Sequence, residues 1–145
     1  MLLDSEIFLA YLLEDDWLHD VALEIITKIK NGELVDVNAS SSIFHELYYI
    51  LSEFVTVDLT LQYLAKIKAI KNINFLDTTS EDLLTAISFV ESFRINSFYS
   101  AIYIAQALSD RNPDRIIIST NTYFDRIKSL KRIDPREIIK KDKED

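Results

Sequence analysis

Apolar residues along the chain fall into two patterns, short unbroken runs and longer stretches with helical spacing. The run Ile116-Ile117-Ile118 is typical of a strand that is buried on both faces. By contrast, Val21, Ile25 and Ile29 recur at the spacing of one helix face. Short strand signals and long helical patterns alternate along the chain, which predicts an α/β fold built from βαβ units around a parallel sheet.

The pattern also gives expected bounds. Strands are expected near residues 2–4, 34–38, 73–76, 115–119 and 132–134. Helices are expected near residues 5–13, 16–30, 42–55, 58–70, 80–93 and 98–108, with a short one at 123–128. Ser5, Asp16, Asp58 and Ser97 are the expected N-terminal caps, and Thr79-Ser80-Glu81-Asp82 resembles a capping box.

The length of 145 residues fits one domain with a single core. We expect this domain to span residues 1–135, followed by a charged tail at 136–145. Residues 126–145 carry eight basic and five acidic side chains, against a net charge of −8 for the whole chain. The net charge argues against binding nucleic acid by bulk charge. The basic end can contact phosphates or can be a solvated tail, and the sequence leaves both open.

Composition excludes several classes of protein. No apolar run approaches the roughly 20 residues of a membrane helix, and the start Met1-Leu2-Leu3-Asp4 lacks the basic flank of a signal peptide, so we expect a cytoplasmic protein with no membrane partner. With no cysteine and two histidines, a thiolate or histidine-built metal site is not expected. Any metal here would be a hard cation on oxygen ligands.

Two acids stand out by position. Asp4 follows the first apolar strand, where a buried carboxylate needs a partner or a cation. Glu46 lies in a mostly apolar helix between Phe44 and Leu47. The carboxyl ends of parallel strands are where open α/β folds place their sites, so we expect Asp4 and Glu46 to share that cleft.

Four segments together resemble the PIN-domain family, the ribonuclease-like domains that include the toxins of VapBC-type toxin–antitoxin pairs. The resemblance spans nearly the whole chain. It rests on the order and spacing of the segments Leu2–Leu12, Phe44–Leu51, Phe98–Ala105 and Ile118–Asp125. It implies a three-layer α/β/α domain with a central, mainly parallel sheet of about five strands.

The resemblance also implies a site. In such enzymes four acids hold Mg²⁺ or Mn²⁺, which activates a water and neutralises the phosphate. Asp4 and Glu46 match two of these acids, whereas the third and fourth positions hold Ser100 and Asn121. We therefore expect Asp4, Glu46, Ser100 and Asn121 at the catalytic position, with metal binding that is weak or absent and RNA hydrolysis that is impaired.

Further acids can compensate for the two substitutions. Asp125 resembles a less constant family acid, and we include it with Asp4 and Glu46 as a candidate metal ligand; a surface role is the alternative. Glu6 can turn into the cleft, although an acid in the first turn of a helix also favours the helix dipole.

Two classes of function stay open. The first is the toxin component of a toxin–antitoxin type pair, with RNA as substrate and an antitoxin-like protein as partner. The second is a catalytically inactive PIN-fold module that binds RNA or a protein. A homodimer is implied by the resemblance, and we expect an interface on the helices around Tyr48, Tyr49 and Tyr103.

Overall fold

The structure is a computed structural model that describes residues 1–140. Its centre is a five-stranded sheet in the order β3-β2-β1-β4-β5, with every neighbouring pair parallel. The strands are β1 (Leu2–Leu3), β2 (Val37–Ser40), β3 (Ile73–Leu76), β4 (Ile116–Ile118) and β5 (Lys131–Ile133). The predicted α/β class and parallel sheet are confirmed.

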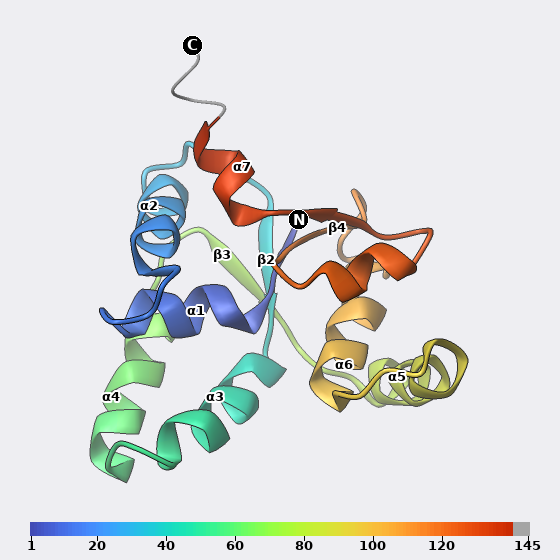
Figure 1. Ribbon diagram of the computed structural model, residues 1–145, viewed down its shortest axis with the longest axis horizontal. Helices are drawn as coiled ribbons and strands as arrows, with labels where there is room; N and C mark the ends of the chain where they lie inside the picture. Colours follow the sequence, from blue (N-terminus) through green and yellow to red (C-terminus); the bar gives the residue numbers. More distant parts are fainter. Residues whose placement is uncertain (141–145) are drawn as a thin grey trace.

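Helices cover the sheet on both sides, which gives the expected three-layer α/β/α arrangement (Figure 1). Helices α1 and α2 pack together on one side, and α5 and α6 pack together on the other. The helices are α1 (Ser5–Leu12), α2 (His19–Lys30), α3 (Ser42–Ser52), α4 (Val57–Lys68), α5 (Ser80–Phe93), α6 (Phe98–Ala107) and α7 (Pro135–Lys140), with a 3₁₀ helix η1 (Thr122–Arg126).

Two of the expected caps are confirmed. Thr79 accepts a hydrogen bond from the Asp82 amide, and the Asp82 carboxylate accepts one from the Thr79 amide, so the capping box opens α5. Ser97 accepts a hydrogen bond from the Ser100 amide at the start of α6.

Three expected caps are wrong. Asp4, and not Ser5, caps α1 by accepting a hydrogen bond from the Ser5 amide. Thr56 caps α4 two residues before Asp58. Helix α2 begins at His19, because the Asp16 carboxylate closes the preceding turn by accepting from the Leu18 amide.

Strand β2 lies at Val37–Ser40, later than the expected residues 34–38. Asp36 has a left-handed backbone (φ 56°), which breaks the extended run before the strand begins. Both faces of the sheet are covered: Leu2, Ile117 and Ile118 are fully buried. Burial on both faces explains why the central strands are short apolar runs without alternation.

The C-terminal helix α7 packs against α2 and buries Pro135 and Ile139. Part of the expected charged tail, residues 136–140, is therefore helical. Residues 141–145 lie outside the described residues, and a boundary at residue 135 stays a prediction. Within residues 1–140, no helix is both long and apolar enough to cross a membrane.

Candidate functional site at the carboxyl edge of the sheet

Asp4 lies where β1 ends, at the carboxyl edge of the sheet. Its amide donates to the Ile118 carbonyl oxygen of β4. Its carboxylate accepts from the Ser5 amide (2.8 Å) and from the hydroxyl of Ser119 (2.7 Å), the residue that follows β4. Only 8% of Asp4 is exposed. The parallel pairing of β1 with β4 thus fixes a buried carboxylate at the predicted edge.

Burial raises the pKa of the Asp4 carboxyl from 3.8 to about 7. The hydrogen bond from Ser119 opposes this rise, while the negative charges of Glu6 and Glu46 add to it. Asp4 therefore lies close enough to Glu6 and to Glu46 to be repelled by each of them. A cation at this edge would relieve both the desolvation and the repulsion.

Glu46 reaches the same region from α3. Its Oε1 accepts a hydrogen bond from the Tyr103 hydroxyl of α6 at 3.1 Å. Tyr103 is 1% exposed, so our expectation that it contributes to an exposed interface is wrong. Burial, followed by the charge of Glu46, raises the pKa of Tyr103 above its usual range. The phenol therefore stays protonated, and its O–H donates to the Glu46 carboxylate and orients it.

Glu6 is the residue whose placement the sequence left open, and its carboxylate turns toward the segment that follows β4. It accepts from the Thr120 amide, from the Thr120 hydroxyl at 2.7 Å and from the Ser119 hydroxyl at 3.3 Å. These partners follow β4 directly. The signal in the sequence was the spacing: an acid two residues after Asp4 lies on the first turn of α1, next to the end of β4.

Ser100 and Asn121 lie together, and the expectation that they share one cleft with Asp4 and Glu46 stays a prediction. Both line a cavity of about 250 Å³ between the start of α6 and the start of η1. Asn121 caps η1, because its Oδ1 accepts from the Tyr123 amide at 3.0 Å. Neither Asp4 nor Glu46 is among the residues that line this cavity. The two substituted positions therefore line a cavity of their own next to the acids, because the Ser119 hydroxyl accepts from the Asn121 amide (3.0 Å) and donates to Asp4 (2.7 Å).

Asp125 makes a two-pronged ion pair with Arg132, at 2.9 Å to Nε and 3.1 Å to Nη2. The side chain of Asp125 is half exposed. Arg132 also donates to the Ser119 carbonyl oxygen. The charge of Asp125 is thus already balanced by a guanidinium, which favours the surface role over the predicted role as a metal ligand.

The acids fit a hard cation in part. In the described part of the chain, no three Asp, Glu or His side chains converge closely enough to hold a metal ion by themselves. No ion pair to Asp4, Glu6 or Glu46 is found among residues 1–140 either. Magnesium often binds through one or two carboxylates and keeps several waters. The carboxylate and hydroxyl oxygens here match that kind of site.

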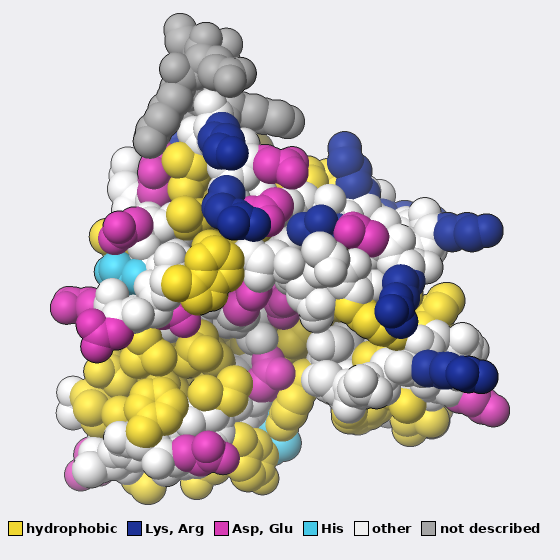
Figure 2. Space-filling view, viewed as in Figure 1, with side chains coloured by type: hydrophobic (Ala, Val, Ile, Leu, Met, Phe, Trp, Pro, Cys, Tyr) yellow, Lys and Arg dark blue, Asp and Glu magenta, His cyan; other side chains and the backbone are white. Residues whose placement is uncertain are grey.

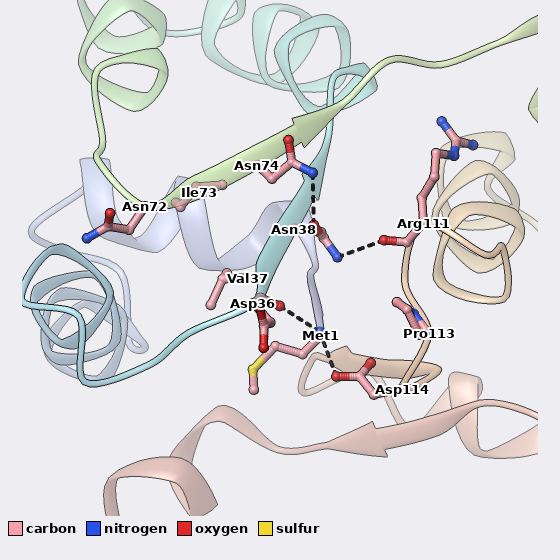
Figure 3. A pocket seen from close by; sticks show the side chains of 10 residues that line it. All are labelled: Met1, Asp36, Val37, Asn38, Asn72, Ile73, Asn74, Arg111, Pro113 and Asp114. Carbon is pink, nitrogen blue, oxygen red and sulfur yellow. Dashed lines mark hydrogen bonds and ion pairs between the residues drawn. The ribbon is translucent and has the colours of Figure 1, made fainter.

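A polar hollow of about 710 Å³ lies at the opposite, amino edge of the sheet (Figure 3). Its amides bond one another: Asn74 donates to Asn38 (3.3 Å), and Asn38 donates to Asn112 (3.0 Å) and to the Arg111 carbonyl. These bonds join β2, β3 and the loop before β4. The amides of Asn38 and Asn112 are therefore satisfied within the fold.

No family model and no curated protein matches this sequence. Fifteen chains of solved structures match, among them three that cover 80–92% of this chain. VapBC2 from Rickettsia felis, bound to a DNA fragment from its promoter, gives a TM-score of 0.67 at 13% identity over 91% of this chain and 96% of that one. A toxin–antitoxin complex from Klebsiella pneumoniae gives 0.61 at 16% identity, over 92% and 96%.

The third structure is VapC20 of Mycobacterium tuberculosis, a toxin that cleaves the sarcin–ricin loop, with a TM-score of 0.61 at 15% identity over 80% of this chain and 85% of that one. Identities this low carry the fold and not the chemistry. The chain is therefore a three-layer α/β/α domain with the PIN-like fold of VapC-type toxins.

Proposed function

We propose that this protein is a PIN-fold, ribonuclease-like toxin component of a toxin–antitoxin type pair, acting in the cytoplasm, with impaired Mg²⁺- or Mn²⁺-dependent RNA hydrolysis. One observation carries the proposal. Buried Asp4 is coupled to Glu6 and Glu46 at the carboxyl edge of the sheet, while Ser100 and Asn121 line a neutral cavity beside them. The edge thus keeps half of an acidic site.

Each residue has a role in this proposal. Asp4 and Glu46 would hold the cation, together with waters, and Glu6 adds negative charge beside them. The bound cation would activate a water and neutralise the phosphate of the RNA. Ser119 fixes the Asp4 carboxylate by its hydrogen bond, and Tyr103 fixes Glu46 in the same way. Ser119 and Tyr103 are both buried, and their fixed positions keep the two acids in place before a ligand binds.

Impairment follows from charge. Unit charges about 4 Å apart interact by roughly 4 kcal/mol at an effective dielectric of 20. Replacing two acids by Ser100 and Asn121 therefore removes a large share of the attraction for a divalent ion. The hydroxyl and the amide keep oxygen atoms that can accept hydrogen bonds from bound water. Weak binding through waters is what these groups can supply.

An antitoxin-like partner is favoured by an apolar groove of about 710 Å³ between the end of α1 and α4. Apolar side chains cover this side of the molecule (Figure 2), and Phe54 is 56% exposed. The groove is lined by Leu12, Leu13, Glu14, Asp15, Asp16, Phe54, Val55, Tyr63 and Lys66. Its acidic run suits a helix that presents apolar residues beside Lys or Arg.

A homodimer is favoured by exposed apolar side chains on α3, α5 and α6. They are Tyr48, Tyr49, Ile50, Leu83, Leu84, Ile87 and Phe98. Exposed apolar patches of this kind often mark interfaces. Sedimentation of the purified protein should show a dimer at tens of micromolar, an estimate of the range where a standard interface persists. A monomer at that concentration would contradict the dimer.

The second candidate is a catalytically inactive PIN-fold module that binds RNA or a protein partner. The observation in its favour is that no three acidic or histidine side chains converge among residues 1–140. The two candidates differ in metal binding: an impaired enzyme holds Mg²⁺ or Mn²⁺ weakly at Asp4 and Glu46, and a module with a decayed site does not.

Calorimetric titration with MgCl₂ and MnCl₂ tests the proposal. We expect weak binding by the parent protein and its loss in Asp4→Asn. The exposed Asp58→Asn change on α4 is the matched control and should leave binding unchanged. Absence of binding in the parent, or equal binding by the parent and Asp4→Asn, would contradict the proposed site and favour the binding module.

A further inference from the structure

The cavity beside Ser100 and Asn121 is uncharged. It lies between the turn that joins α5 to α6 and the start of η1, and its volume is about 250 Å³. Drug-sized ligands occupy pockets of roughly 300–1,000 Å³, so this one suits a single small ring system. Its lining consists of Ile95, Asn96, Ser97, Ser100, Asn121 and Tyr123. No carboxylate or ammonium group belongs to this lining.

The cavity is lined on one side by Tyr123, whose side chain is held at its hydroxyl and covered on one ring face. The Tyr123 hydroxyl donates to the carbonyl oxygen of Phe93, the last residue of α5. The Arg126 guanidinium lies over the same ring, 4.8 Å from its centre. A ring fixed in this way loses little freedom when a second planar group stacks on it.

The polar groups of the lining can both donate and accept. The Asn121 Oδ1 already accepts from the Tyr123 amide, which leaves its NH₂ group as a donor toward a ligand. The Ser97 oxygen accepts from the Ser100 amide, which leaves its O–H to donate. Asn96 contributes an exposed amide with both functions. This mixture matches the edge of a nucleobase, which carries both donors and acceptors.

Basic side chains lie on the segments next to this cavity. Arg94 follows α5, Arg126 ends η1 and Lys128 comes shortly after it, and all three are exposed, as is the acid Asp125 within η1. Figure 2 shows Lys and Arg gathered over η1, β5 and α7, whereas the α1 and α2 side carries mainly acids. A strand that places its phosphates on the basic segments would bring its bases to the cavity and a phosphate toward Asp4 and Glu46.

We propose that the cavity formed by Asn96, Ser97, Ser100, Asn121 and Tyr123 binds one unpaired nucleobase of single-stranded RNA, stacked on the Tyr123–Arg126 pair. The inference rests on the proposed function in taking RNA as the ligand, but it requires neither a metal nor cleavage. It assigns the neutral part of the edge to binding the base, beside the acidic part that faces the phosphate.

Fluorescence anisotropy of a short labelled single-stranded RNA, with the full chain in EDTA, tests this pocket. Stacking of one base on an aromatic side chain contributes roughly 1–3 kcal/mol, so Tyr123→Ala should weaken binding on the order of tenfold. Tyr123→Phe keeps the ring and should bind within about twofold of the parent, by the same stacking argument. Arg126→Gln, at an exposed position, should weaken binding several-fold without affecting the fold.

A second probe separates stacking from a structural effect of the substitutions. An RNA of the same length without bases should bind the parent about as weakly as the intact RNA binds Tyr123→Ala. Equal affinity of the parent for both strands, or unchanged binding by Tyr123→Ala and Arg126→Gln, would overturn the pocket while leaving RNA binding intact. A parent protein that binds no single-stranded RNA at all would refute the proposed RNA ligand itself, and the pocket with it.

Discussion

The two parts of the carboxyl edge differ in what they require from their surroundings. The acidic part, Asp4 with Glu6 and Glu46, buries negative charge that hydroxyl and amide donors satisfy only in part. In the neutral part, the Ser100 amide donates to the Ser97 cap and the Asn121 side chain caps η1, and the two residues line an open cavity. One fold thus holds a region of neighbouring carboxylates beside a neutral region, and the difference lies in the side chains and not in the backbone.

The largest expected effect concerns the charge of Asp4. Its pKa is raised in the folded state from 3.8 to about 7, so the folded protein binds more protons than the unfolded chain between these values. Stability should therefore fall as the pH rises from 4 to 8. At about 1.4 kcal/mol for each pKa unit, the loss is about 4 kcal/mol. Urea unfolding across this range measures it.

The Asp4→Asn variant isolates this contribution. It should lose most of the pH slope and should be more stable than the parent at pH 8, whereas Asp58→Asn should keep the slope. Added MgCl₂ should stabilise the parent at pH 8 and not Asp4→Asn, because a cation that binds only the folded state stabilises it by mass action. If Asp4→Asn leaves the pH dependence of stability unchanged, the carboxyl of Asp4 is not its cause.

The next effect comes from making the neutral part acidic. The double change Ser100→Asp and Asn121→Asp should raise Mg²⁺ or Mn²⁺ affinity on the order of 100-fold, because added carboxylates near the cluster cannot all stay ionised without a cation. Without metal the same variant should be less stable than the parent. The uncharged swap Ser100→Asn and Asn121→Ser is the matched control, and calorimetry gives both affinities.

No gain of affinity in the double variant would mean that these two positions lie too far from Asp4 and Glu46 to share a cation. The neutral part would then be a binding surface alone, and the comparison between the two parts would become a comparison between two independent sites.

A smaller effect separates the two acids that the sequence left undecided. Glu6→Gln should weaken metal binding several-fold, because the Glu6 carboxylate adds to the negative potential at Asp4. Asp125→Asn should leave it unchanged, since Arg132 already balances that charge. Because the Asp125 side chain is half exposed, its pair with Arg132 should contribute no more than about 1 kcal/mol to stability. Equal effects of the two variants on metal affinity would remove this distinction.

The sequence was sufficient for the fold because local and long-range signals agree. The apolar runs of β1 and β4, the Thr79–Asp82 capping box and the Ser97 cap each predict their element in place. Where two nearby residues could cap a helix, the predicted cap was wrong. Asp58 has a side chain suited to capping, but the Thr56 hydroxyl accepts from the Leu59 amide and caps α4. Asp16 holds a turn instead of starting α2.

The site was harder to predict because its geometry depends on partners far along the chain. The direction of Glu6 is set by Ser119 and Thr120, more than a hundred residues away, and no periodicity records that contact. Helical spacing alone left Tyr103 open to a core or an interface role, and only the fold buries it and brings its hydroxyl to Glu46. The ion pair of Asp125 with Arg132 likewise depends on how η1 packs beside β5.

The most direct test of impaired chemistry is the rate at which single-stranded RNA is cleaved in MnCl₂ by the parent and by the Ser100→Asp, Asn121→Asp double variant. We expect slow or no cleavage by the parent, faster cleavage by the double variant that EDTA stops, and loss of that gain when Asp4→Asn is added. A parent protein that already cleaves RNA as fast as the double variant would contradict the claim that the neutral part limits the site.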